Sequence, residues 1–328
     1  MTINSKLNVG IIGSGKIGTD LLIKILRSEL LRCELFVGRD IDSPGIQKAK
    51  SIGINVSDKS LQAFKDHPRK LDLVFDATSA AHHVGHASYF REQGIKAIDM
   101  TPAKVGRFCV PTIDADVVTL EPNVNMITCG GQASIPVIHT LSHVYPRITQ
   151  IEVRSHLAAD SIGPGTLANI DEYYSSTASA ISAYSCIQNV SVDLQVENSA
   201  WKPDMLTVIR AYTDDSDLEK LFAPLQQRVA SVRKQVPGYN IVGTPRYKDG
   251  AVELLVSVRG QGDWIPAHAG NLDIINCAAI AIAEKYAEHL GYNPALAPSS
   301  NGRDVMQGAL GSIFGLLGKG GKSVPGAA

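Results

Sequence analysis

The sequence predicts an α/β protein in which a doubly wound parallel sheet precedes an α+β domain whose sheet is mostly antiparallel. In the first part of the 328 residues, short apolar strands alternate with helical segments, and a glycine-rich turn follows the first strand. After residue 150 the strands alternate apolar and polar side chains, which is typical of a sheet with one solvated face. These patterns predict a first domain at 1–130, a second at 131–270, a helix at 271–290 that packs back on the first sheet, and a flexible tail at 291–328.

Composition excludes several classes of function. The formal net charge is -1 and the pI is about 6.8, which gives no basis for binding nucleic acid or an anionic membrane surface. No apolar run is long enough to span a membrane, and the first residues lack the apolar core of a signal peptide. The five cysteines are scattered without a Cys-x-x-Cys pair. We therefore expect a globular protein of the reducing cytoplasm.

The first strand and the turn after it form the first candidate binding site. Leu7–Ile12 is apolar, residues 13–18 have the sequence G-S-G-K-I-G, and helical periodicity covers 21–30. In such a turn the first glycine bends the chain, the second lets the backbone approach a pyrophosphate, and the third packs helix against strand. This context predicts a dinucleotide-binding Rossmann domain, and a glycine-rich turn of some other α/β protein is the alternative. The predicted contact residues are Gly13, Ser14, Gly15, Lys16, Ile17 and Gly18.

The end of the second predicted strand bears on the choice of dinucleotide. Glu34–Val37 is followed by Gly38, Arg39 and Asp40. A carboxylate at this position accepts hydrogen bonds from the adenosine ribose and disfavours a 2′-phosphate, so Asp40 favours NAD. Arg39 beside it is a feature that could accommodate NADP.

Two further predicted strands, 71–76 and 97–100, end in polar turns. Thr78 and Ser79 follow the first strand, and Thr101 follows the second. In doubly wound sheets, ligands bind at the carboxyl ends of the strands. We therefore expect Thr78 and Ser79 to line the cofactor crevice.

Cys129 is the candidate nucleophile. A short apolar run ends at Thr128, two glycines follow the cysteine, and helical periodicity begins at Ser134. At a strand-to-helix corner, unpaired backbone N–H groups and the helix dipole favour the thiolate, and the N–H groups of Gly130 and Gly131 can stabilise an oxyanion. A buried structural cysteine is the alternative.

The histidines give no metal site. His82 and His86 have i,i+4 spacing, as do His139 and His143, and His83 lies beside the first pair. No third ligand accompanies either pair at a suitable spacing, so we expect solvated histidines on helix faces and no bound metal.

The second domain combines alternating strands with polar helices. Strands are predicted at 151–156, 190–196 and 252–258, and helices at 173–184 and 218–232. We expect these strands to supply a subunit interface, which makes a homodimer the expected assembly. An Ala-rich helix at 272–290 follows, and Asn271 either caps it or places an amide near the nicotinamide.

Six segments together resemble the acylating acetaldehyde dehydrogenases, CoA-dependent enzymes of meta-cleavage pathways. They are I-I-G-S-G-K-I-G-T-D-L (11–21), L-V-F-D-A-T-S-A (73–80), I-D-M-T-P-A (98–103), N-V-N-M-I-T-C-G-G-Q-A-S-I-P (123–136), G-P-G-T-L-A-N-I-D-E (163–172) and P-A-H-A-G-N-L-D-I (266–274).

The resemblance implies a function and a set of contacts. It implies NAD-dependent oxidation of a short-chain aldehyde, acetaldehyde or propanal, with CoA as co-substrate and Cys129 carrying the acyl-thioester. It also implies a 4-hydroxy-2-oxovalerate aldolase as a possible partner. The NAD contacts that it implies are Ser14 to Ile17, Asn271, and the loop of Ser161, Ile162, Gly163, Pro164, Gly165, Thr166, Leu167, Ala168 and Asn169.

The segment at 183–210 departs from this family. Related chains are expected to carry R-D-T-V here, with the aspartate near the nucleophile, and aligning Thr207-Val208 puts Leu206 in its place. Asp204 is the tentative substitute.

Two other functions stay open. One is a cysteine-dependent semialdehyde or phosphorylating dehydrogenase, for which His156 and His268 are candidate partners of the cysteine. The other is a non-catalytic NAD-binding regulator.

Overall fold

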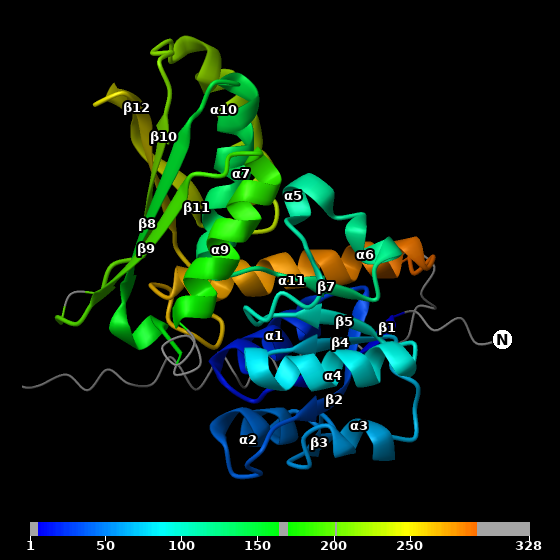
Figure 1. Cartoon of the computed structure of the whole chain (residues 1–328). Helices are drawn as coiled ribbons and strands as arrows, with labels where there is room; N and C mark the ends of the chain where they lie inside the picture. The colour runs from blue at the N-terminus through cyan, green and yellow to red at the C-terminus, as the bar shows by residue number, and fades with distance from the viewer. Residues whose placement is uncertain (1–5, 164–169, 201, 294–328) are drawn as a thin grey trace, which may run out of the picture.

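The computed structural model describes residues 6–163, 170–200 and 202–293, and two sheets organise this part of the chain. Figure 1 shows the first sheet in the lower half of the view, the second at the upper left, and helix α11 running between them. The first sheet has seven strands and the second has five. The predicted α/β class, with a parallel sheet followed by a mostly antiparallel one, is confirmed.

The first sheet is parallel throughout and has the order β3-β2-β1-β4-β5-β7-β6. Its strands are β1 (Leu7–Ile12), β2 (Leu31–Val37), β3 (Val56–Ser57), β4 (Leu73–Asp76), β5 (Lys96–Asp99), β6 (Arg107–Phe108) and β7 (Asn123–Asn125). The connecting helices are α1 (Lys16–Arg27), α2 (Pro44–Ser51), α3 (Gln62–Asp66), α4 (Ala80–Glu92), α5 (Pro111–Asp114) and α6 (Val117–Leu120). The order reverses between β1 and β4, and a ligand crevice forms at such a point.

Helix α1 differs in its bounds from the prediction. It begins at Lys16, directly after the glycine turn, rather than at residue 21. It ends at Arg27 because the Ser28 hydroxyl accepts the backbone N–H groups of Leu30 and Leu31, each at 3.2 Å, and turns the chain into β2. The nucleotide turn is therefore joined without a break to a helix whose positive end faces the crevice.

The second sheet has the order β11-β12-β10-β8-β9 and is antiparallel except between β8 and β9. Its strands are β8 (Gln150–Ala158), β9 (Val190–Glu197), β10 (Met205–Tyr212), β11 (Tyr239–Lys248) and β12 (Ala251–Val258). The short helix η1 (Ala159–Ser161) follows β8. The longer helices α7 (Cys129–Val144), α9 (Ile170–Ser185) and α10 (Glu219–Arg233) lie along one face (Figure 1).

Side chains of the second sheet alternate between this covered face and the opposite one. Along β10, Met205, Thr207 and Ile209 are buried, whereas Leu206 and Val208 are only half-buried. The covered face packs into one apolar core with α7, α9 and α10. Strand alternation thus decides which β10 side chains face the helices, including the helix that begins at Cys129.

Helix α11 (Gly270–His289) lies between the two cores. Ala279 and Ile282 pack in the core of the first sheet, and Ile274 and Cys277 pack in the core of the second. Within the described ranges, no helix is long and apolar enough to cross a membrane.

A buried lysine joins α1 to α11 and to the chain just before α11. The Lys24 ammonium lies 2.7 Å from a carboxylate oxygen of Asp263, 2.7 Å from Asp273 and 3.2 Å from Asp20. These carboxylates hold the pKa of Lys24 above its ordinary value despite its burial. Removing Lys24 would take this ion-pair partner from three buried carboxylates, so the cluster fixes α11 against the nucleotide-binding helix.

Candidate active site

The glycine turn has the geometry that dinucleotide binding requires. Gly13 has φ +116° and lies against the backbone of Ala77, so only glycine fits there. A Cβ on Gly18 would lie 1.8 Å from the Gly13 carbonyl oxygen, which shows how closely helix α1 approaches the turn. A Cβ on Gly15 would meet no atom within 4 Å among the described residues. The second glycine therefore borders open space, as expected where a pyrophosphate approaches the backbone.

Three distant segments meet at the edge of this turn. The Lys16 ammonium donates to the Asp160 carbonyl oxygen at 2.6 Å. The Asp160 carboxylate contacts His268 at 2.9 Å and also forms an ion pair with Lys202. These contacts hold the pKa of Asp160 below its ordinary value, the Lys202 hydrogen bond having the largest effect. Helix η1, the chain before β10 and the chain before α11 therefore lie beside the turn.

Asn271 is an interior residue of α11 rather than its cap. The cap position is Ala269, and the Asn271 side-chain N–H₂ donates to the Ser161 carbonyl oxygen at 2.9 Å. The side chain is 2% exposed, and its Oδ1 finds no hydrogen-bond partner among the residues that the structure describes. The N-cap interpretation is wrong, because the amide is used to hold Ser161. Ile162 and Gly163 follow Ser161, and the predicted contacts Pro164 to Asn169 lie outside the described residues.

The other predicted cofactor residues lie at strand ends of the first sheet. Asp40 follows β2, is exposed, and accepts the Asp42 backbone N–H at 2.9 Å. The Thr78 hydroxyl donates to Asp76 at 2.5 Å, and Ser79 lies 2.7 Å from a ring nitrogen of His82. Their role at a cofactor stays a prediction.

Cys129 lies at the same edge of the sheet, where β7 passes into α7. The helix begins at Cys129 itself, five residues before the predicted start, because the Thr128 hydroxyl caps it by accepting the Gly131 N–H at 3.0 Å. Ile127 has φ +67°, a strained conformation for a β-branched residue. The Asn125 side chain holds this turn by accepting the Ile127 N–H at 2.7 Å. The Gly131 N–H is used by the cap, so it is not a free oxyanion donor.

Burial and hydrogen bonding act in opposite directions on the cysteine. Burial raises the pKa of Cys129 to about 11, while the Tyr173 hydroxyl and the backbone N–H groups of Gly130 and Cys129 lower it. The backbone N–H groups that were expected to favour the thiolate at the start of α7 are present. Desolvation outweighs these hydrogen bonds, so the thiol form is favoured at neutral pH.

Tyr173 is a residue of the site that sequence analysis missed. Its hydroxyl lies 4.0 Å from the Cys129 sulfur, and the side chain is 3% exposed. A Cβ on Gly130 would lie 2.3 Å from this hydroxyl, so the glycine is needed for the tyrosine to fit. The only signal in the sequence was its place on a polar helix.

A buried charged network supports the turn from the side of the first sheet. Asp76 accepts ring N–H groups of His83 and His86, each at 2.8 Å, and the other ring nitrogen of His83 lies 3.3 Å from Asp99. Asn125 donates to Asp99 at 2.6 Å. Burial raises the pKa of Asp99 to about 6, whereas the two histidines hold the pKa of Asp76 well below its usual range against burial.

The prediction of solvated helix-face histidines is therefore wrong for His83 and His86. Both are buried because the carboxylate of β4 draws them inward, whereas His82 is exposed. In the described part of the chain, no group of three or more His, Cys, Asp or Glu side chains could hold a metal ion.

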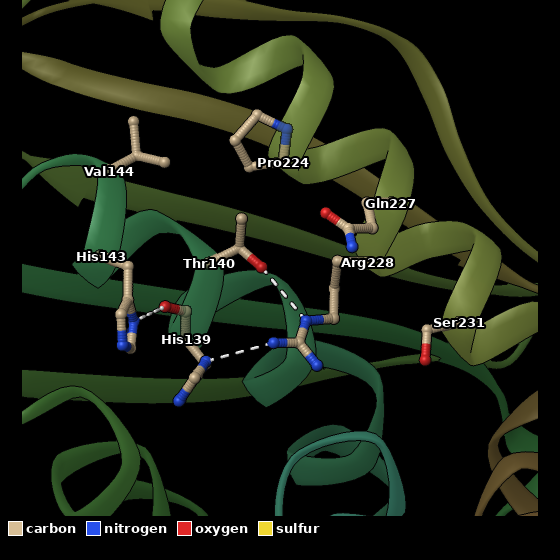
Figure 2. A pocket seen from close by; sticks show the side chains of 8 residues that line it. All are labelled: His139, Thr140, His143, Val144, Pro224, Gln227, Arg228 and Ser231. Atoms are coloured by element: carbon tan, nitrogen blue, oxygen red, sulfur yellow. Dashed lines mark hydrogen bonds between the residues drawn. The ribbon is translucent and has the colours of Figure 1, made fainter.

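The second histidine pair borders a cavity of about 390 Å³ between α7 and α10. Figure 2 shows Arg228 of α10 pointing toward Thr140 and His139 of α7. Burial, together with His143 and Arg228, lowers the pKa of His139 to about 4. His139 lies ten residues after Cys129, roughly 15 Å along the helix, so this cavity is separate from the nucleophile.

The comparisons with known proteins identify the family. A family model described as prokaryotic acetaldehyde dehydrogenase, dimerisation, matches residues 129–266. The acetaldehyde dehydrogenase of Spirochaeta aurantia is 46% identical over 282 residues, covering 86% of this chain and 95% of the relative. That of Pectobacterium atrosepticum is 44% identical over 284 residues, covering 86% and 96%. The chain belongs to the acetaldehyde dehydrogenase family. The predicted oxidoreductase class is thereby confirmed.

A solved structure shows the same architecture. Aspartate semialdehyde dehydrogenase II from Vibrio cholerae, in complex with ASA, has a TM-score of 0.60 and 14% sequence identity. The match covers 86% of this chain and 99% of that structure, and at this identity it bears on the fold alone.

Strand alternation places Leu206 and Thr207 on opposite faces of the second sheet. Leu206 lies on the sheet face away from the helices, whereas Thr207 lies on the covered face and contacts Ser155 at 3.0 Å. Of these two side chains, only Thr207 therefore faces the helices, including α7, which begins at Cys129. The alignment of Leu206 with the family aspartate stays a prediction. Asp204 is half-buried and accepts a hydrogen bond from Arg259 at 2.9 Å. Its assignment to the cysteine stays a prediction.

Proposed function

We propose that this protein is an NAD-dependent acylating dehydrogenase that oxidises acetaldehyde or propanal and transfers the acyl group to CoA. The observation that carries the proposal is the placement of Cys129. The cysteine begins α7 directly after β7, and the glycine turn follows β1 of the same parallel sheet. Both therefore lie at the carboxyl edge, where a nucleophile and a dinucleotide can meet.

The protein residues account for the covalent steps. The Cys129 thiolate adds to the aldehyde carbon and forms a thiohemiacetal, whose oxyanion lies near the backbone N–H groups at the helix start. Loss of hydride from that carbon leaves a thioester on the sulfur. NAD supplies the hydride acceptor when bound. The thiol of CoA then displaces Cys129 from the acyl group, a thioester exchange that keeps the oxidation energy.

The residues at the crevice fit a nicotinamide dinucleotide. The buried Oδ1 of Asn271 is an acceptor awaiting a donor, as the carboxamide of nicotinamide would provide. Asp40 lies exposed after β2, where it can accept the ribose hydroxyls and repel a 2′-phosphate. We therefore favour NAD over NADP, although Arg39 is exposed beside Asp40.

The uncovered face of the second sheet is the proposed dimer interface. It carries half-buried apolar side chains of neighbouring strands, Leu206, Val208 and Leu255, and the matching family model describes dimerisation. We infer a homodimer. A 4-hydroxy-2-oxovalerate aldolase stays a proposed partner. The free cysteines support a reducing cytoplasm.

A single assay tests the reaction. NADH formation is measured by absorbance with acetaldehyde or propanal, NAD and CoA, for wild type and Cys129→Ser. We expect the variant to lose at least about three orders of magnitude in rate, because the covalent nucleophile is gone. Cys186→Ser, which changes an exposed cysteine, is the matched control and should keep full activity. An unchanged rate in Cys129→Ser would remove this residue from the mechanism.

Replacing CoA by phosphate tests the competing class. Acyl phosphate formed without CoA would identify a phosphorylating or semialdehyde type of enzyme. His268 contacts Asp160, and His156 lies 3.7 Å from Glu197, so the structure directs both candidate histidines to carboxylates. Trapping the acyl-enzyme by intact-protein mass spectrometry with a panel of aldehydes would define chain length. Failure to reduce NAD with any aldehyde would favour a regulator.

A further inference from the structure

The environment of the Cys129 sulfur contains a hydroxyl that the covalent chemistry above does not use. The Tyr173 hydroxyl lies 4.0 Å from the sulfur, and α9 brings it there from 44 residues away in the chain. Burial, and the proximity of Cys129, hold the pKa of Tyr173 well above its usual value. The phenol therefore keeps its proton, and it can donate a hydrogen bond but cannot act as a base at neutral pH.

Neighbouring groups orient the phenol hydrogen. The Ser155 hydroxyl and the Gly130 backbone N–H lower the pKa of Tyr173 against burial, as donors near its oxygen do. A Cβ on Gly130 would lie 2.3 Å from the Tyr173 oxygen and 3.6 Å from the Ser155 oxygen, so both hydroxyls border the same glycine. In the thiol form, the Cys129 S–H donates to the Tyr173 oxygen. Once the sulfur is ionised it can only accept, and the Tyr173 hydrogen can then turn to it. Ser155 in turn lies 3.0 Å from the hydroxyl of Thr207. Either hydroxyl can be the donor in that pair, so Thr207 can leave the Ser155 hydrogen available to Tyr173.

We propose that Tyr173 is a catalytic hydrogen-bond donor to the Cys129 sulfur, and that Ser155 and Thr207 are positioning residues that aim its hydrogen. The inference deepens the proposed function, since it rests on Cys129 being the nucleophile. When the thiol loses its proton to solvent, the sulfur becomes an acceptor and the Tyr173 hydrogen bond becomes charge-assisted. No proton passes along the chain of hydroxyls. The chain stabilises the thiolate in a site where burial opposes it.

The arrangement also accounts for the missing carboxylate of the 183–210 segment. The covered face of β10 presents Thr207 toward Ser155, and all three groups of the chain are neutral. A carboxylate there would compete with the thiolate through like-charge repulsion, but it could accept a proton. The three hydroxyls therefore supply hydrogen-bond donors toward the sulfur but no group that can take up its proton.

Alkylation of Cys129 tests the proposal without requiring turnover. Rates with iodoacetamide are measured between pH 8 and 10, and peptide mass spectrometry separates Cys129 from the exposed Cys186. In Tyr173→Phe we expect alkylation of Cys129 to slow about 3- to 10-fold at each pH. Loss of the donor lowers the thiolate fraction, and the higher nucleophilicity of a more basic sulfur offsets part of that loss. Aldehyde oxidation should slow about 10- to 100-fold.

Two further variants keep the test decisive. Tyr174→Phe is the matched control: its ring lies 5.9 Å from that of Tyr173, and it should leave alkylation unchanged. Ser155→Ala removes one orienting donor and should slow alkylation by a smaller factor in the same direction. Alkylation of Tyr173→Phe at the rate of Tyr174→Phe would overturn the proposal, even if turnover fell. Slower alkylation in a protein that reduces no NAD would support the donor role and refute the proposed reaction.

Discussion

Two polar networks meet at the Cys129 corner, one from each sheet, and they differ in charge. Under the first sheet, Asp76, His83 and Asp99 form ionic contacts in a region with almost no solvent exposure. On the side of the second sheet, Tyr173, Ser155 and Thr207 form a chain of neutral hydroxyls. The charged network reaches the backbone of the corner through Asn125, whereas the hydroxyl chain reaches the sulfur.

The difference separates two tasks that a half-buried nucleophile imposes. A strained turn such as that at Ile127 persists only if its surroundings hold it, and ionic hydrogen bonds are strong enough to do so. The sulfur itself must become negative, and a nearby carboxylate would oppose that change. Charge is thus used where the backbone must be held, and neutral donors are used where charge must develop. Changes in the first network should affect stability, and changes in the second should affect reactivity.

The largest expected loss of stability comes from the charged network. Asp76→Asn replaces an acceptor of two histidine N–H groups and of Thr78 by an amide whose N–H₂ must face donors. Leaving buried histidine charge uncompensated should lower the free energy of unfolding by about 3–5 kcal/mol. Urea unfolding at pH 7 measures it. A loss below about 1 kcal/mol would show that the network does not hold the fold.

A somewhat smaller effect should appear in the pH dependence of stability. Burial raises the pKa of Asp99 to about 6, so between pH 4 and 6 the folded protein retains a proton that the unfolded chain releases. Stability from this group therefore falls as pH rises through that window, by up to about 3 kcal/mol. Asp99→Asn cannot ionise and should show a flatter profile. Parallel unfolding profiles of variant and wild type from pH 4 to 7 would contradict the assignment.

Much of the first sheet was predictable, because its strands are continuous apolar segments bounded by turns. Leu7–Ile12 was predicted with its observed bounds, and the glycine turn after it has the expected geometry. The strands β10 and β11 were missed. Most of β10 lies in the divergent segment 183–210, and the alternation along β10 is what places Thr207 rather than Leu206 on the covered face.

The sequence predicts a cysteine at the corner between β7 and α7, but it does not predict the side chains that surround this cysteine. A cysteine between a strand and a helix is visible in the sequence, although α7 starts five residues earlier than the pattern predicts. The approach of Tyr173 depends on how α9 packs against α7, which no local pattern encodes. The burial of His83 and His86 likewise depends on Asp76, a residue of a different element. Polar residues on a helix predict solvent exposure unless a buried partner is known.

The smallest expected effect on stability comes from the hydroxyl chain and sharpens the comparison most. Thr207→Val keeps the shape of the side chain and removes one hydrogen bond to Ser155, which costs about 1 kcal/mol or less. Alkylation of Cys129 should nevertheless slow, though less than in Ser155→Ala, because Thr207 acts on the sulfur through two other hydroxyls. Urea unfolding and iodoacetamide rates on the same preparation measure both effects. If Thr207→Val lowered stability as much as Asp76→Asn while alkylation stayed unchanged, the hydroxyls would be a structural network like the charged one. The division between holding the backbone and tuning the sulfur would then fail.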